Sequence, residues 1–254
     1  MRFEAAPTAE TLKFWTPEQC TAFLEFIEQP YQVTTKGHSR TDDTGIPYEV
    51  GDYTRTKELQ EQLKVFIYLA LFSGLRKGEL LALEWADIDF EKDVVTVSKS
   101  VGYTKGEQFV KVPKTKHGFR KVAIPHFLTL RIKTMKTERL RYRLSVGDYW
   151  KGGEWLFVQE NGKLMSYSTS YQAFHDSILR YNESHKEPLP VIPLHGLRHT
   201  SATLLIANNQ DICSASARLG HAETSTTLNI YTHFLESTDK KSADILENVL
   251  VKHA

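Results

Sequence analysis

The sequence lacks the features that define several classes of protein. It has two cysteines in 254 residues, Cys20 and Cys213, and their separation fits neither a zinc site nor a redox motif. A disulfide-stabilised scaffold is therefore excluded, and a reducing compartment is favoured. The longest apolar run, from Val65 to Phe72, is too short to span a bilayer. Because no basic and apolar leader opens the chain, we expect a cytoplasmic protein with no membrane partner.

Two common sources of catalytic power are also missing. There is no Walker-type glycine-rich loop, so a nucleoside triphosphate is not indicated as fuel. There is no cluster of carboxylates for a metal ion. His195 and His199 have the four-residue spacing of a zinc pair, but no Glu lies between them and no third ligand is evident. We therefore expect neither a metal nor any other cofactor.

What the chain does have is an ordinary globular composition with an uneven distribution of charge. Apolar residues make up 41% and charged residues 25%, with a formal net charge of +1, and the length suits one large domain or two small ones. Between Lys99 and Arg143, however, thirteen Lys or Arg face only two acids, which leaves the rest of the chain about ten charges negative. Such a block fits a surface that meets a polyanion, and it fits a solvated helix face equally well.

Local patterns predict a mainly helical α+β protein with a small three-stranded antiparallel sheet. Thr16 and Pro17 have the chemistry of a helix start, and that helix is expected to end near Gln29. The polar stretch 34–56 is predicted to be a long mobile loop. Strands are expected at 94–97, 109–112 and 121–124 because these runs are rich in β-branched residues. Further helices are expected at 58–71, 76–85, 127–143, 168–181, 197–207, 212–219, 226–234 and 240–252. Cys213 falls on one of them, and we expect it to be buried.

Three short segments carry the residues best suited to chemistry. They are Ser73 to Leu80, which contains Arg76; His195 to Thr200, which contains Arg198; and Leu219 to His221, which Tyr231 follows ten residues later. Taken singly, each has an ordinary structural reading: an i,i+3 pair of Arg76 with Glu79, for example, is common on helices. Taken together they can handle a phosphodiester. Arginines grip phosphate oxygens, histidines donate hydrogen bonds or move protons, and a tyrosine hydroxyl can attack phosphorus.

These segments resemble the Arg, His-x-x-Arg, His and Tyr boxes of the tyrosine recombinases, the integrases of phages and transposons. The boxes are Gly74-Leu75-Arg76-Lys77-Gly78-Glu79, His195-Gly196-Leu197-Arg198-His199-Thr200, Leu219-Gly220-His221 and Tyr231. Their order and intervals match the family, and the resemblance extends from about Trp15 to Phe234. It implies the catalytic-domain fold of DNA breaking-rejoining enzymes.

The resemblance also implies a mechanism without metal or ATP. Tyr231 would attack the scissile phosphate of double-stranded DNA, leaving a 3′-phosphotyrosyl link and a free 5′-hydroxyl. Arg76 and Arg198 would hold the nonbridging oxygens, and arginines would then take the place of metal ions in stabilising the transition state. His195 and His221 would assist by hydrogen bonding and proton handling. Glu79 would support Arg76.

The family places a lysine on a β-hairpin as general acid for the leaving 5′-oxygen. Here Pro113 to Arg120 resembles that hairpin, and Lys114 is the first candidate, with Lys116 as the alternative. A lysine at such a tip can reach the minor groove of DNA. Lys116, Arg120 and Lys121 are also predicted to bind DNA.

The resemblance further suggests how the chain is organised. Residues 1–14 would be a leader or linker remnant, 15–236 the catalytic domain, and 237–254 a helical tail. Apolar positions in the tail suit either its own domain or a neighbouring subunit, and exchange would build a tetramer on DNA. DNA attachment sites, accessory bending or excision factors and a bacterial host are the partners and setting implied. Since family members usually carry a further N-terminal DNA-binding domain, this chain alone should bind DNA weakly.

Two other functions remain compatible with the sequence. A type IB topoisomerase shares the tyrosine chemistry, but the short chain and the terminal helix argue against it. A DNA-binding module that has lost catalysis is the third hypothesis, and the presence of every box argues against that.

Overall fold

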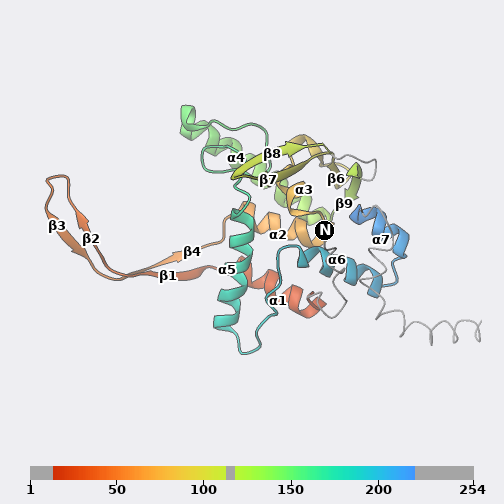
Figure 1. The fold of residues 1–254 in the computed structure, drawn as a ribbon, viewed down its shortest axis with the longest axis horizontal. Helices are drawn as coiled ribbons and strands as arrows, with labels where there is room; N and C mark the ends of the chain where they lie inside the picture. Colours follow the sequence, from red (N-terminus) through yellow and green to blue (C-terminus); the bar gives the residue numbers. More distant parts are fainter. Residues whose placement is uncertain (1–13, 113–117, 221–254) are drawn as a thin grey trace, which may run out of the picture.

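The computed structural model describes residues 14–112 and 118–220. Its helices and short 3₁₀ turns are α1 (Pro17–Glu28), α2 (Glu61–Ser73), α3 (Lys77–Leu81), η2 (Trp85–Asp87), α4 (His126–Val146), η4 (Gly147–Tyr149), α5 (Thr169–Ser184), α6 (Gly196–Ala207) and α7 (Ile212–Leu219). Its strands are β1 (Tyr31–Thr35), β2 (His38–Thr41), β3 (Pro47–Val50), β4 (Tyr53–Lys57), β5 (Ile88–Asp89), β6 (Val94–Val97), β7 (Ser100–Thr104), β8 (Glu107–Lys111) and β9 (Arg120–Ala123). The predicted α+β class, mainly helical, is confirmed (Figure 1).

Helix α2 is the centre of the body. Val65, Phe66 and Leu69 are fully buried on it, and it contacts α1, α4, α5 and α6. Its apolar residues face all sides, which is the pattern of a helix surrounded by others. Gly74 ends it in the left-handed conformation at φ +64°. No helix in the described ranges is long and apolar enough to cross a membrane.

Local sequence signals account for most of the helix boundaries. Thr16 and Gln19 form a capping box at the start of α1, as the Thr-Pro pair predicted. Helices α4 to α7 lie within three residues of their predicted limits. The predicted helix 76–85 is shorter: α3 ends at Leu81, and the chain then pairs with Trp155 through a bridge at Glu84.

The three-stranded antiparallel sheet exists with a different membership. Its order is β5-β6-β9, so the runs at 94–97 and 121–124 are present, but the run at 109–112 is not part of it. That run forms β8, which pairs with β7 in a separate hairpin. Lys105 and Gly106 close the hairpin with positive φ, and the Phe109 ring covers Gly102 across the strands. This strand therefore pairs with β7, its neighbour in sequence, and not with the three-stranded sheet.

The segment 34–56, predicted as a mobile loop, is instead a long antiparallel arm. Strand β1 pairs with β4, and β2 pairs with β3 further out. The arm projects from the body beside α5 (Figure 1). Its polar composition hid the strands because both faces are open to solvent, so no alternation with apolar residues was required. Thr34 and Thr54 hydrogen-bond across it, and the Asp42 side chain accepts the Thr44 and Ile46 N–H groups at the tip.

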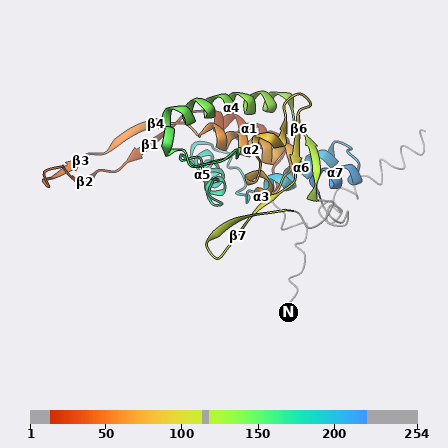
Figure 2. The same cartoon turned by 90° about the horizontal axis from the view of Figure 1, so that it is seen from above.

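The basic block between Lys99 and Arg143 does not form one face. Figure 2 shows α4 along one edge of the molecule and β7 at the opposite edge. Several of the block's cations also pair with acids from elsewhere: Lys99 with Glu84 and Asp87, Arg120 with Glu79, Arg131 with Glu28 and Glu61, and Arg143 with Glu154. The uneven charge in sequence is thus partly compensated in space.

Candidate active site

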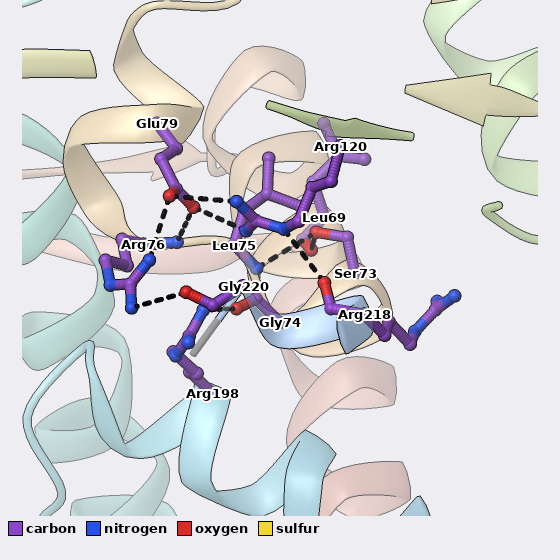
Figure 3. Close-up of polar contacts among 10 residues, drawn as sticks. All are labelled: Leu69, Ser73, Gly74, Leu75, Arg76, Glu79, Arg120, Arg198, Arg218 and Gly220. Atoms are coloured by element: carbon purple, nitrogen blue, oxygen red, sulfur yellow. Dashed lines mark hydrogen bonds and ion pairs between the residues drawn. The ribbon is translucent and has the colours of Figure 1, made fainter. Parts of the chain in front are cut away.

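Arg76 sits on the tight connection between α2 and α3. Gly74 makes the turn possible: its φ is +64°, and a Cβ there would lie 2.5 Å from Cδ2 of Leu219. Arg76 then caps α3, with its side chain 42% exposed. Its Nη1 donates to Oε1 of Glu79 at 3.1 Å, and its Nη2 donates to the carbonyl oxygen of Gly220 at 3.2 Å. The guanidinium is therefore held at two points (Figure 3), and the exposed part of the side chain reaches solvent.

Glu79 is a buried carboxylate between two arginines. It accepts the backbone N–H of Arg76 at 2.8 Å, and Arg120 donates to both of its oxygens at 3.1 and 2.7 Å. Burial opposes its charge, but the bonds and charges of Arg120 and Arg76 outweigh burial and hold the pKa of Glu79 below its ordinary value. Glu79 therefore contacts Arg76 directly and remains ionised near neutral pH, while its supporting role in catalysis stays a prediction.

Arg198 lies beneath the same turn. It is on the first turn of α6, is 2% exposed, and donates from Nη1 to the carbonyl oxygen of Gly74 at 2.7 Å. Trp15 ties α6 in place from the other side, because its backbone N–H donates to the Thr200 hydroxyl. Figure 3 shows Arg198 and Arg76 on the same side of Gly74 and Gly220. The structure thus brings together the two arginines that the sequence placed 122 positions apart.

His195 precedes α6 and lines a groove of about 550 Å³ together with Arg76, Lys77 and residues of the β7–β8 hairpin. The pKa of His195 is lowered to about 4, first by burial and then by the nearby charges of His199, Arg198 and Arg76. Part of His195 is exposed to solvent. Its ring is nevertheless surrounded by enough protein to lower the pKa. Its imidazole is neutral at pH 7 and can accept a proton.

His199 contacts His195 edge to face, with ring centroids 4.7 Å apart. Its pKa is also lowered by burial and by Arg198. Within residues 14–112 and 118–220, no group of three or more His, Cys, Asp or Glu is arranged to hold a metal ion. His195 lies at the cap position of α6 and His199 on the helix itself, so the two rings pack against each other.

The remaining candidates fall outside the described residues. They are Lys114, Lys116, His221 and Tyr231, together with the leader apart from Phe14 and the tail 237–254. Their roles stay predictions, as does the division into domains. The flanking positions are described: β8 ends at Lys111, β9 begins at Arg120, and α7 ends in the left-handed Gly220 beside Arg76.

Two of the predicted DNA-binding residues have opposite environments. Lys121 is exposed on β9. The neighbouring Arg120 side chain is 8% exposed and points inward to Glu79 and to the carbonyl oxygen of Arg218. The alternation of side chains along the strand could have predicted that Arg120 is buried, since Arg120 shares its face with the buried Val122 and Ile124.

Sequence reasoning missed Lys77, which lines the groove, and Arg218, which braces a neighbouring helix. Lys77 lies over the Tyr167 ring, 3.5 Å from its centroid, and burial lowers its pKa. Arg218 donates to the carbonyl oxygens of Phe72 and Ala123 and so braces α7 against α2 and β9. A basic residue in the last turn before a helix-ending glycine was the available signal for Arg218. Nothing local in the sequence marked Lys77.

Comparisons with known proteins identify the family of the chain. Residues 49–237 match the model of the phage integrase family. A tyrosine recombinase XerC-like protein of Caldanaerobacter subterraneus subsp. tengcongensis is 30% identical over 204 residues, covering 75% of this chain and 50% of the relative. The ICEBs1 integrase of Bacillus subtilis is 28% identical over 251 residues, covering 96% of this chain and 56% of the relative. The chain therefore spans about half the length of these curated relatives.

Solved structures show the same fold. The Tn1549 transposon integrase, solved in complex with transposon right-end DNA, superposes with a TM-score of 0.70 at 24% identity, covering 98% of this chain and 68% of that one. XerH site-specific recombinase bound to its difH substrate gives a TM-score of 0.59 at 22% identity, with 97% and 56% covered. With three quarters of its length matched by the family model, the chain belongs to the phage integrase family.

Proposed function

We propose that this chain is the catalytic part of a site-specific DNA recombinase that cuts and rejoins double-stranded DNA at attachment sites. One observation carries the proposal: Arg76 and His195, 119 positions apart, line one groove, and Arg198, three residues after His195, donates to the carbonyl oxygen of Gly74 on the turn that carries Arg76. Two guanidinium groups and a neutral imidazole suit a phosphodiester passing through a pentacoordinate transition state.

The proposed reaction balances without metal or ATP. The phenol oxygen of Tyr231 attacks phosphorus, and the bond from phosphorus to the 5′ oxygen breaks. His195, neutral at pH 7, takes the phenolic proton. Lys114, or alternatively Lys116, gives a proton to the leaving 5′ oxygen. Arg76 and Arg198 stabilise the nonbridging oxygens with help from His221, and the reverse reaction reseals a strand.

A nicked duplex tests the nucleophile. The duplex carries the junction sequence of the mobile element that encodes the chain. After cleavage, the short 5′-hydroxyl fragment next to the nick dissociates, so the covalent adduct is trapped. Wild type should form the adduct, and Tyr231→Phe should abolish it while leaving DNA binding intact. Tyr142→Phe, exposed on α4, is the matched control. An adduct that survives Tyr231→Phe would show that another residue attacks.

The general acid requires a second substrate. When sulfur replaces the bridging 5′ oxygen, the leaving group no longer requires protonation. If Lys114 is the acid, Lys114→Ala should cleave this substrate as fast as wild type while failing on normal DNA. If Lys116→Ala shows that rescue instead, Lys116 is the acid.

We also propose that the tail 237–254 links protomers into a tetramer on DNA. An apolar groove of about 450 Å³ runs between α1, α2 and α6. Its apolar lining includes Leu24, Leu71, Phe72, Leu204 and Leu205. The tail carries Ala243, Ile245, Leu246, Val249 and Leu250, which suit such a groove.

A designed cysteine pair distinguishes exchange from packing within one chain. Leu204→Cys and Leu246→Cys, combined in a Cys213→Ser background, should form a disulfide-linked dimer when the protein assembles on DNA. A disulfide found only within single chains would contradict exchange. Deleting 240–254 should leave DNA-bound protein monomeric by light scattering.

The proposed setting is the cytoplasm of a bacterial host, in association with DNA, with accessory bending or excision factors. Its support is that the matched relatives come from bacteria and their phages and transposons. Cell fractionation followed by DNA crosslinking would test this location.

A further inference from the structure

The guanidinium of Arg120 points into the protein, where it donates hydrogen bonds to protein groups. Its Nη1 and Nη2 donate to the two oxygens of Glu79, at 3.1 and 2.7 Å, and its Nε donates to the carbonyl oxygen of Arg218 at 2.9 Å. The side chain is 8% exposed and is absent from the lining of the groove that holds Arg76 and His195. A bidentate arginine in this position fixes the orientation of the carboxylate that it holds.

That carboxylate in turn orients Arg76. Both oxygens of Glu79 are shared: Oε1 accepts from Nη1 of Arg76 and Oε2 from its backbone N–H, while Arg120 binds the same two atoms. Figure 3 shows Glu79 between the two guanidinium groups. Without Arg120, the buried carboxylate of Glu79 would have, among the residues that the structure describes, only the half-exposed Arg76 as its counter-charge.

Arg120 also stands where three parts of the site meet. It begins β9, paired with Val97 of β6, directly after the segment that contains Lys114 and Lys116. It holds the last turn of α7 through Arg218, and a Cβ on Gly220 would lie 2.8 Å from its Nη1. Gly220 both packs on Arg120 and accepts from Arg76, and His221 follows it in sequence. The Arg120 side chain thus connects β9, the carboxylate that holds Arg76, and the end of α7.

We propose that Arg120 is a positioning residue that holds Glu79, and through it the Arg76 guanidinium, in the geometry that stabilises the scissile phosphate, and that it is not a DNA contact. This inference rests on the proposed recombinase function. It replaces the DNA-binding role that the sequence alone indicated for Arg120, and it leaves that role to the exposed Lys121.

Single-turnover adduct formation on the nicked junction duplex separates the two roles. Arg120→Met should lower the rate at saturating protein by about 100-fold, the size expected when a catalytic group is misplaced by about 1 Å. The Kd for DNA and its salt dependence should stay within about twofold. Lys121→Met should instead weaken binding and reduce the salt slope by about one. Arg141→Met, an exposed arginine on α4, controls for the loss of one positive charge.

A neutral substrate identifies the route through Arg76. A methylphosphonate at the scissile position removes the charge that Arg76 would neutralise. If Arg120 acts through Arg76, the deficit of Arg120→Met should shrink at least tenfold on this substrate, in parallel with Arg76→Met. A general defect in folding would slow both substrates equally and overturn the proposal. So would a wild-type rate for Arg120→Met, or a loss of DNA affinity without a loss of rate.

A double variant keeps the test valid if Arg120→Met fails to fold. Glu79→Gln with Arg120→Met removes both charges and leaves no buried ion without a partner. We expect this protein to fold and bind DNA but to form adduct as slowly as Glu79→Gln alone, since the two residues act as one unit. Wild-type rates in the double variant would overturn the inference. Absence of adduct from wild type itself would overturn the proposed function, and this inference with it.

Discussion

Nη1 of Arg198 donates a 2.7 Å hydrogen bond to the carbonyl oxygen of Gly74, joining the start of α6 to the turn that carries Arg76. The bond requires the backbone at residue 74 to present its carbonyl toward α6, which the left-handed conformation at φ +64° provides. The geometry of the two arginines therefore depends on the backbone conformation of Gly74.

Replacing Gly74 by alanine should destabilise the protein by about 2 kcal/mol or more. A left-handed alanine costs about 1–2 kcal/mol, and its Cβ would lie 2.5 Å from Cδ2 of Leu219, which adds a packing penalty. Urea unfolding measures the loss. In a Leu219→Ala background the same change should cost less, because only the backbone strain remains. Equal costs in the two backgrounds would show that Leu219 does not set the penalty.

The sequence predicted the elements whose signals are local. Capping at Thr16 and apolar periodicity in α2 placed helices well, since both depend on residues within a few positions. The strands of the arm at 34–56 were not predicted because a ribbon with two solvated faces needs no apolar alternation. Strand β8 was assigned to the wrong sheet because the turn at Lys105 and Gly106 decides its partner. The composition of one strand does not predict which other strand it pairs with.

The sequence named the residues of the candidate site but not the contacts among them. The boxes identified Arg76, His195 and Arg198, yet no local pattern says that Arg198 bonds to Gly74 or that Arg120 turns inward to Glu79. Charge alone favoured DNA for Arg120. Its burial follows from the alternation of β9 and from the need of a buried carboxylate for a counter-ion.

The two cysteines should react very differently with a thiol reagent. Cys213, expected to be buried, is exposed on α7, whose first turn presents it to solvent. Cys20 is buried in α1, and burial raises its pKa to about 12, so little thiolate forms. Ellman's reagent at pH 8 should titrate one thiol in the folded protein and two in urea. Rapid labelling that persists in Cys213→Ser would contradict this assignment.

His195 should make stability depend on pH below neutrality. An unfolded histidine has a pKa near 6.5, whereas folding lowers that of His195 to about 4. Between these values the unfolded chain binds more protons than the folded one at this position, so stability falls as the pH falls from about 6.5 to 4. Below that range both states are protonated and the loss is complete.

Urea unfolding at several pH values tests the His195 effect. His195→Gln should lose less stability than wild type between pH 6.5 and 4. His199, whose pKa is also lowered, acts in the same direction, so His199→Gln should flatten the profile as well. A titration of His195 followed by NMR with a midpoint near 6.5 would contradict the prediction.

The arm should contribute almost nothing to the stability of the body. None of the residues between Tyr31 and Lys57 belongs to the hydrophobic core cluster or packs against it, and the inner strands pair only with each other. A two-stranded ribbon with both faces in water is marginally stable alone. Replacing residues 33–55 with an Asn-Gly turn between the paired Gln32 and Thr56 should therefore change the free energy of unfolding by less than about 1 kcal/mol.

The core substitution Leu69→Ala calibrates this comparison. Leu69 is fully buried, so its truncation should cost about 2–5 kcal/mol in the same urea assay. A comparable loss on shortening the arm would contradict the prediction and show that the outer strands stabilise the body. The shortened protein keeps Tyr31, Lys57 and the contact at the base of the arm, where Arg180 lies 3.9 Å over the Tyr31 ring, so the comparison isolates the contribution of the outer arm.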